Sequence, residues 1–276
     1  MAILRESPYV NHPCFSNNRE NLWHRIHLPV ALKCNLKCVF CSHSVGSSCH
    51  TSKPGYAAHL MTPKEAVDRT IMEIKKDSRI RIVAVSGPGE PLANPETFAT
   101  LEKIRKFRKD IHFCLSTNGT MLADHVQWLV DVGFKTLTVS MSTAKAETAS
   151  KIYEWASFNE RKLTGIQMGS KVVGEQLRGI SVAARKGLFI KVNSILIPSI
   201  NDQDIIPLAK KIVKLGASLH NIVPLVPNAG FANHSPPKNS ELEALRAEAE
   251  KFIDQFRHCK QCRSDVVGIP GCDVIL

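Results

Sequence analysis

The chain has 276 residues, with 36 Lys and Arg against 25 Asp and Glu, and a formal net charge of +11. Hydrophobic residues make up 43% of it, which excludes extended disorder and is enough to build the core of one large domain. No stretch approaches the ~18 uninterrupted apolar residues of a membrane span, and the N-terminal segment lacks the apolar region of a secretion signal, so we expect a cytoplasmic protein.

Apolar segments typical of strands alternate along the chain with segments typical of helices. Where strands and helices alternate with short connections, the strands form a parallel sheet with right-handed crossovers. Six such units fit here, against the eight of a closed TIM barrel, so we predict an α/β fold, an open partial (β/α)6 barrel of TIM type. The six predicted strands are 25–32, 80–87, 111–119, 134–142, 188–198 and 219–227.

Three of the predicted helices begin with sequences typical of helix caps. Thr62 precedes Pro63 and is followed by Glu65, which predicts a capping box. Asn94 before Pro95, and Asn201 and Asp202 before the helix predicted over 205–216, indicate two further N-caps.

The alternation stops after residue 227, which suggests three parts of the chain. A connector rich in Pro, Gly and Asn is followed by one helix, 240–256, and a cysteine-bearing tail. We therefore expect an N-terminal segment (1–24), the barrel (25–227) and a C-terminal part (228–276) that comprises this helix and the tail.

The positive charge invites a comparison with nucleic-acid-binding proteins. The basic segments 69–81 and 103–110 lie in predicted helices and contain acidic residues as well. Only three Tyr and three Trp are present to stack on bases. The basic residues are better explained as solvated helix faces, and we expect neither a nucleic-acid nor a membrane partner.

The nine cysteines are unusual for a chain of this composition. An odd number without an export signal argues against a disulfide framework and favours metal ligands. Cys34, Cys38 and Cys41 follow the first predicted strand with the spacing Cys-x3-Cys-x2-Cys, and Phe40 precedes the last of them. Zinc ribbons and plant-type ferredoxins use other spacings, although a zinc knuckle stays possible.

This triplet resembles the signature of the radical S-adenosylmethionine (SAM) superfamily. The resemblance implies that Cys34, Cys38 and Cys41 are the catalytic residues. Their thiolates would hold a 4Fe–4S cluster whose remaining iron binds SAM, and reductive cleavage of SAM would give a 5′-deoxyadenosyl radical.

Three further segments resemble the SAM-binding parts of that superfamily. The sequence Gly-Pro-Gly-Glu-Pro, 87–91, ends the second strand and is similar to its GGEP-type motif. Polar residues end the third strand, and one face of the fourth is rich in hydroxyls, as expected of a strand that lines a ligand cavity or of an exposed edge strand. The residues expected to contact SAM are Gly87, Pro88, Gly89, Glu90, Ser116, Thr117, Asn118, Ser140 and Asn193.

Cys114 lies in the third strand, in step with Ser116 and Asn118, so these three side chains should face the same side of the sheet. A single cysteine in a strand is more often a small core residue, and a histidine on an apolar strand, such as His27, is more often part of the core. Neither residue is a predicted metal ligand on its own.

Almost the whole chain resembles the NifB family of radical SAM enzymes, which build the iron–sulfur core of the nitrogenase cofactor. The resemblance implies two additional 4Fe–4S substrate clusters, one held by Cys14, His27 and Cys114 and one by Cys49, Cys259 and Cys262, with Cys272 left over. The segments that carry it are 12–15, 27–41, 87–94, 115–119, 151–156, 191–202, 215–225 and 259–268.

The resemblance implies a function in cofactor assembly. The enzyme would fuse the two 4Fe–4S clusters, inserting a carbide derived from SAM and a sulfur, to give an 8Fe–9S–C precursor. The implied partners are an iron–sulfur cluster donor, a cofactor carrier or scaffold, and an electron donor such as ferredoxin or flavodoxin.

Several alternatives remain at this stage. Cys49, Cys259, Cys262 and Cys272 could instead form a zinc site. The chain could be another radical SAM enzyme with auxiliary clusters that modifies a peptide or small molecule, or a non-catalytic iron–sulfur carrier.

The chain also departs from the family pattern in three places. Thr51-Ser52-Lys53 replaces the family's Glu-Ser-Arg, the segment 142–146 differs, and Glu90 stands for Asp. The recipient of the product is accordingly either nitrogenase or a nitrogenase-like reductase.

Overall fold

The main sheet of the computed structural model, which describes residues 9–46 and 54–276, is an open, curved layer of eight strands. Its order is β11-β10-β1-β3-β4-β5-β8-β9, and the run from β1 to β9 is parallel. The predicted open, partial barrel is confirmed, and each predicted strand is present in a shorter form. The six parallel strands are β1 (His24–His27), β3 (Ile80–Val85), β4 (His112–Thr117), β5 (Thr136–Ser140), β8 (Phe189–Leu196) and β9 (Leu219–Pro224).

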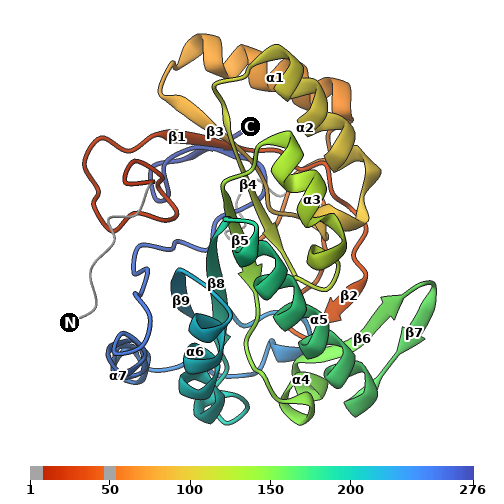
Figure 1. Cartoon of the computed structure of the whole chain (residues 1–276), viewed down its shortest axis with the longest axis vertical. Helices are drawn as coiled ribbons and strands as arrows, with labels where there is room; N and C mark the ends of the chain where they lie inside the picture. Colours follow the sequence, from red (N-terminus) through yellow and green to blue (C-terminus); the bar gives the residue numbers. More distant parts are fainter. Residues whose placement is uncertain (1–8, 47–53) are drawn as a thin grey trace.

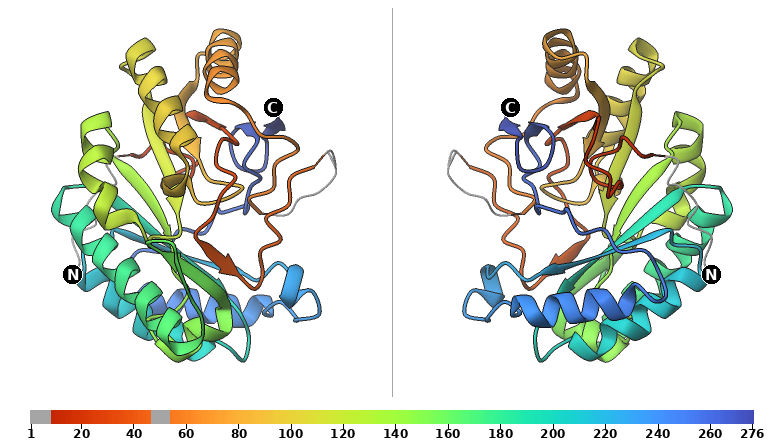
Figure 2. Two further views of the ribbon diagram at one scale, coloured as in Figure 1. Left: turned by 90° about the vertical axis from the view of Figure 1, so that its right-hand side faces the viewer. Right: turned by 90° about the vertical axis from the view of Figure 1, so that its left-hand side faces the viewer.

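Helices cover the outer face of this sheet, and the loops and both terminal segments lie on the other side (Figures 1 and 2). Three short 3-10 helices, Pro91–Ala93, Asp202–Asp204 and Ala229–Phe231, lie in the connections. The α-helices are α1 (Pro63–Lys76), α2 (Pro95–Phe107), α3 (Leu122–Val132), α4 (Ala146–Ile152), α5 (Gly165–Arg185), α6 (Ile205–Lys214) and α7 (Asn239–Ala249). No helix in the described ranges is long and apolar enough to span a membrane.

The alternation of side chains along the strands divides the buried residues into two clusters. Val83 and Val85 of β3 face the helices and belong to the large core, while Ile82 and Ala84 face the opposite side. Cys114 lies in this smaller inner cluster, as its position in step with Ser116 predicts. The other apolar members of the inner cluster are Phe15, Leu219 and Phe256.

A second, three-stranded sheet was not predicted. It comprises β2 (Leu36–Cys38), β6 (Tyr153–Phe158) and β7 (Arg161–Leu163), all antiparallel, and its β6–β7 hairpin projects from the body of the molecule (Figure 1). Cys38 pairs with Tyr153 in this sheet, so the strand pairing orders the end of the cysteine triplet.

Only one of the three predicted N-cap residues forms a capping hydrogen bond through its side chain. Thr62 accepts a hydrogen bond from the backbone N–H of Glu65, and the Glu65 carboxylate accepts one in return, which confirms the capping box. Asn94 is the N-cap residue of α2, with Pro95 in the first turn, as predicted, and Asn201 is the N-cap residue of the 3-10 helix that precedes α6, but neither side chain forms a capping hydrogen bond. Asn94 donates to the carbonyls of Lys33 and Glu90 instead, and Asn201 donates to those of Ser142 and Ile195, because both side chains are buried among loops.

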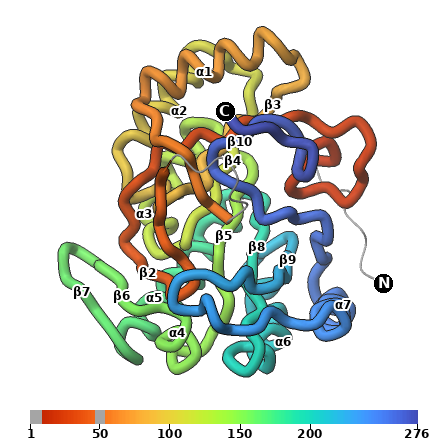
Figure 3. Tube along the Cα trace, turned by 180° about the vertical axis from the view of Figure 1, so that it is seen from behind, coloured from red at the N-terminus to blue at the C-terminus, as the bar shows by residue number. Residues whose placement is uncertain are grey.

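The C-terminal part joins the sheet instead of forming a separate tail. The predicted helix 240–256 ends at Ala249, since the backbone of residues 254–256 pairs with β9 at His220. Two short strands follow, β10 (Val266–Gly268) and β11 (Val274–Ile275), and β10 pairs antiparallel with β1. Figure 3 shows this segment beside the loops of the N-terminal region.

Candidate active site

A cavity of about 320 Å³ opens on the inner side of the sheet, where the loops of both terminal regions meet. It brings together all of the predicted cluster ligands that the structure describes; Cys49 lies outside the described residues. Cys272 is exposed and does not line the cavity. The sulfur and imidazole side chains in the cavity wall are those of Cys14, His27, Cys34, Cys38, Cys41, Cys114, Cys259 and Cys262.

The cysteine triplet occupies one wall of this cavity. Its loop is closed by a backbone hydrogen bond from Cys41 to Cys38, 3.1 Å, and the Lys37 ammonium donates to the Cys41 carbonyl. Burial raises the pKa of Cys34 to about 12 and that of Cys38 well above its usual value. These thiols are therefore neutral in the absence of a cation, and a metal centre is required to make them thiolates.

Glu90 ties the triplet loop to the end of β4. Its carboxylate accepts hydrogen bonds of 2.6 Å from the Thr117 hydroxyl and from the Asn118 backbone N–H, and its own N–H donates to the Lys33 carbonyl. Burial raises the pKa of Glu90 to about 7, and these hydrogen bonds oppose the rise. Both oxygens are used within the protein, which makes Glu90 a brace between two loops.

Gly89 permits the closest backbone approach in this region. A Cβ atom at Gly89 would lie 2.4 Å from the Lys33 carbonyl oxygen, so only glycine fits. Gly87 does not line the cavity, although the rest of the predicted SAM-contacting set does: Pro88, Gly89, Glu90, Ser116, Thr117, Asn118, Ser140 and Asn193.

The opposite wall is organised around Arg25, which sequence reasoning missed. Its side chain is fully buried; Nε donates to Nε2 of His27 at 3.0 Å, and an NH2 group donates to the Cys262 sulfur at 3.0 Å and to Asp273 at 2.7 Å. A guanidinium only donates, so His27 carries its proton on Nδ1, which faces the Arg263 carbonyl at 3.1 Å. Burial, followed by the Arg25 charge, lowers the pKa of His27 to about 3, so the ring is neutral.

Lys191 of β8 is the second missed residue. Its ammonium lies in the cavity wall near Cys14 and Cys114, and the side chain is almost completely buried. The signal was available in both cases: Arg25 and Lys191 are cations inside segments that otherwise read as buried strands, and each is two residues from a predicted site residue.

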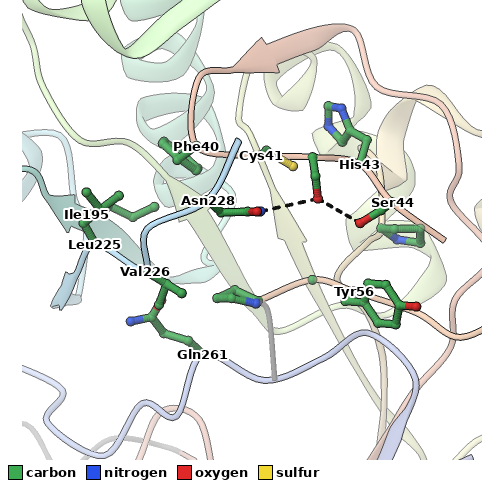
Figure 4. A pocket seen from close by; sticks show the side chains of 14 residues that line it. Phe40, Cys41, His43, Ser44, Tyr56, Ile195, Leu225, Val226, Asn228 and Gln261 are labelled. Atoms are coloured by element: carbon green, nitrogen blue, oxygen red, sulfur yellow. Dashed lines mark hydrogen bonds between the residues drawn. The ribbon is translucent and has the colours of Figure 1, made fainter. Parts of the chain in front are cut away.

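A smaller pocket of about 90 Å³ extends from the cavity beside Cys41 (Figure 4). Apolar side chains form one side of it, and Asn228 and Gln261 add amides. Asn228 donates to the Ser42 hydroxyl at 3.4 Å, which connects the loop after β9 to the triplet loop. The apolar residues are Phe40, Ile195, Leu225 and Val226.

The segment that departs from the family pattern after β5 is used mainly for packing. Ser142 lines the cavity, but Lys145 forms an ion pair of 2.6 Å with Asp204, and the Thr143 hydroxyl donates to the same carboxylate. The other departure, Thr51–Lys53, lies outside the described residues.

Seven thiols of the described residues line the cavity wall, and this donor set suits thiolate-bound iron–sulfur clusters. Among the described residues, no three His, Cys, Asp or Glu side chains are close enough together to hold one metal ion. Each thiolate of a 4Fe–4S cluster binds a different iron and stands apart from the others, whereas zinc draws four ligands to one point. Of the four cysteines considered for a zinc site, Cys259 and Cys262 line the cavity, Cys272 is exposed, and Cys49 lies outside the described residues.

Comparison with known proteins assigns the class. Residues 28–212 match the radical SAM superfamily. A radical SAM methyltransferase from Sphaerobacter thermophilus has the same fold, with a TM-score of 0.60 at 18% identity over 84% of this chain and 65% of that one. SuiB from Streptococcus suis is similar, with a TM-score of 0.60 at 14% identity over 86% of this chain and 50% of that one. The chain belongs to the radical SAM superfamily, which implies a 4Fe–4S cluster and SAM.

Its curated relatives narrow the assignment. The FeMo cofactor biosynthesis protein NifB of Methanocaldococcus infernus is 35% identical over 94% of this chain and 85% of its own length. That of Klebsiella pneumoniae is 38% identical over 95% of this chain, which spans only 57% of that relative. Within the superfamily, the chain belongs to the NifB family.

Proposed function

We propose that this protein is the radical SAM enzyme that fuses two 4Fe–4S clusters, with a carbide from SAM and an added sulfur, into the 8Fe–9S–C precursor of a nitrogenase or nitrogenase-like cofactor. Its relatives from M. infernus and K. pneumoniae carry the name FeMo cofactor biosynthesis protein. One SAM would donate its methyl group to a substrate cluster, and a second would supply the radical that abstracts hydrogen from that methyl.

The observation that carries this proposal is the composition of one cavity. Three thiols of the triplet share it with four more cysteines and a histidine that come from separate segments of the chain. A radical SAM enzyme whose auxiliary clusters need only the C-terminal cysteines would leave Cys14, His27 and Cys114 unexplained. Two substrate clusters held around one space could meet there and fuse.

The residues of the triplet wall would bind and orient SAM. When bound, the triplet cluster supplies the electron that cleaves SAM. Ser116, Ser140 and Asn193 offer polar groups along the strand ends, and the pocket at Phe40 and Leu225 offers apolar surface suited to an adenosyl group.

His27 would serve the first substrate cluster through a neutral ring. The lone pair of this ring is on Nε2, which accepts a hydrogen bond from Nε of Arg25. Iron could bind at this nitrogen only in exchange for that bond, while the Arg263 carbonyl would keep the proton on Nδ1.

Partners follow from the same proposal. An iron–sulfur cluster donor must supply the substrates, a ferredoxin- or flavodoxin-type donor must supply electrons, and a carrier or scaffold must receive the product. The net charge of +11 favours acidic proteins in each of these roles.

Anaerobic reconstitution tests the proposal. We expect about 12 irons per chain, three clusters of four, together with cleavage of SAM in the presence of dithionite. Replacing Cys114 with Ala should remove about four of these irons and leave the SAM-responsive cluster in place. Cys272→Ala is the matched control, because that thiol is exposed and outside the cavity, and its iron content should equal that of the wild type.

Each rival function predicts a different result. About four irons together with bound zinc would identify another radical SAM enzyme. Full cluster binding without SAM cleavage would identify a carrier. An unchanged iron content in Cys114→Ala would refute the assignment of Cys114.

A further inference from the structure

Lys191 presents a buried positive charge to the cavity. The side chain, on β8, is 3% exposed, and its Nζ donates to the Cys14 carbonyl at 2.7 Å. The ammonium also lies 4.7 Å from the centre of the Phe15 ring and 4.8 Å from that of Phe256. Two aromatic faces and one carbonyl surround it.

These contacts do not neutralise the charge. An ammonium has three N–H donors, and a buried cation is normally paired with an anion. Across the ranges 9–46 and 54–276, no carboxylate forms an ion pair with Lys191; its partners are the carbonyl and the two rings. Lys191 instead lines the cavity, so an anion inside the cavity can pair with it.

The surroundings of Lys191 identify which part of the cavity this is. Its hydrogen bond is to the backbone of Cys14, and its charge also acts on the side chains of Cys114 and His27.

We propose that Lys191 is an anion-binding residue of the first substrate site, where its ammonium lies beside the iron–sulfur cluster held by Cys14, His27 and Cys114 and pairs with the negative charge that this cluster gains on reduction. The inference rests on the proposed function and adds a residue to it. With two thiolates and a neutral imidazole, a 4Fe–4S cluster whose core carries a 2+ charge has no net charge, and it becomes anionic when it takes up one electron. A buried cation beside it therefore favours the reduced cluster. The hydrogen bond to the Cys14 carbonyl couples the same ammonium to the position of one ligand.

Three substitutions separate charge from hydrogen bonding. Lys191→Gln keeps an N–H donor for the Cys14 carbonyl but removes the charge, Lys191→Met removes both, and Lys191→Arg keeps the charge. Lys210→Gln is the matched control, because Lys210 also lies over a ring, that of Phe252 at 4.6 Å, but on the exposed surface.

The first measurement is iron content with EPR potentiometry after anaerobic reconstitution. We expect Lys191→Gln and Lys191→Met to lose about four irons per chain or to shift one cluster to a more negative midpoint potential, whereas Lys191→Arg and Lys210→Gln match the wild type. Wild-type iron content and potentials in Lys191→Gln would overturn the proposal.

The second measurement is thermal unfolding of the metal-free protein. If the Lys191 ammonium has no anionic partner in the metal-free protein, Lys191→Met should unfold at the same temperature as the wild type or higher, because the substitution removes an uncompensated charge. A lower unfolding temperature in both Lys191→Met and Lys191→Gln would mean that Lys191 merely stabilises the fold, and would refute the proposal. A wild-type chain that takes up only about four irons would instead refute the proposed function itself.

Discussion

The two walls of the cavity are built in different ways. The triplet wall, Cys34, Cys38 and Cys41, comes from one short loop between β1 and α1. The auxiliary wall is assembled from segments that are up to 248 residues apart in the sequence, and it consists of Cys14, His27, Cys114, Cys259 and Cys262. The hydrogen bond between Arg25 and Asp273 spans the same separation. The three triplet cysteines are close in the sequence, and the pairing of Cys38 with Tyr153 orders the end of their loop, while the second wall exists only when β1, β4 and the C-terminal segment pack together.

The electrostatics of the walls differ as well. The triplet wall contains the buried carboxylate of Glu90, and its nearest cation, Lys37, is partly exposed. The auxiliary wall contains two buried cations, Arg25 and Lys191. The buried charge of the two walls is therefore opposite in sign. Under the proposed function, the two cations of the auxiliary wall would offset the negative charge of the substrate clusters.

Removing a ligand from the triplet wall should have the largest effect. Cys38→Ala takes away a thiolate that only its own loop can supply, so SAM cleavage should fall to background, with the loss of about four irons. Chromatographic assay of 5′-deoxyadenosine and iron analysis check this. Substantial SAM cleavage by Cys38→Ala would contradict the assignment of the triplet.

Removing Arg25 should destabilise the auxiliary wall. In Arg25→Met, the Asp273 carboxylate, the Gly268 carbonyl and His27 lose a buried partner, and we expect a loss of about 3–5 kcal/mol in the free energy of unfolding. Urea denaturation of the metal-free protein measures it.

The control for this change is a surface arginine. Arg257 pairs with Glu243 and Glu250, which are both about half exposed, so Arg257→Met should cost no more than about 1 kcal/mol. Equal effects of the two substitutions would show that Arg25 does not organise its wall.

Glu90→Gln should weaken the triplet wall in a pH-dependent manner. In Glu90→Gln, an NH2 group replaces one of the two carboxyl oxygens that accept hydrogen bonds, and this group then faces another donor. We expect a loss of about 1–3 kcal/mol in the free energy of unfolding at pH 5.5, where the wild-type carboxyl is mostly protonated. Because the pKa of Glu90 is raised to about 7, the protonated carboxyl stabilises the fold at low pH, and this stabilisation is lost as the pH rises through about 7. The free energy of unfolding that Glu90→Gln loses relative to the wild type should therefore be smaller at pH 8.5 than at pH 5.5.

Urea denaturation at the two pH values checks this sign. Glu102→Gln, on the exposed face of α2, should show no such dependence. If the stability loss of Glu90→Gln instead increased with pH, Glu90 would already be ionised at pH 5.5.

Thr62→Ala should have the smallest effect, since it lies outside both walls. Loss of the capping box of α1 should cost about 1 kcal/mol in unfolding free energy. Iron content and SAM cleavage should match those of the wild type. A change in either would show that α1 contributes to the cavity and that the two walls are not independent of the surrounding helices.

Much of the fold was predictable because it follows local patterns. The six parallel strands come from apolar segments, and Thr62 caps α1 because its capping box is complete within four residues. Asn94 and Asn201 carry the same kind of signal, but tertiary partners compete for their side chains. The sheet of β2, β6 and β7 was missed because its short strands gain their stability only from pairing with distant segments.

The same distinction between local patterns and tertiary contacts applies to the candidate site. The spacing of Cys34, Cys38 and Cys41 predicted one cluster without any structure, because turns within the loop bring those thiols to one side. The gathering of Cys14, Cys114 and Cys262 in one cavity could be expected only from a family resemblance, since no local rule relates residues so far apart. Arg25 and Lys191 were not predicted as site residues, because the pattern of a strand does not indicate which of its cations will be buried.

The amino-acid sequence by itself determined the parallel sheet, the triplet loop and the class of chemistry, all of which depend on neighbouring residues and on the period of the apolar pattern. Only the tertiary structure decided that the other thiols share the cavity, that Arg25 fixes the tautomer of His27, and that the Lys191 ammonium is buried beside Cys14. The physical reason is that burial, and with it the charge that a site can hold, depends on what packs around a residue and not on the residues beside it in the chain.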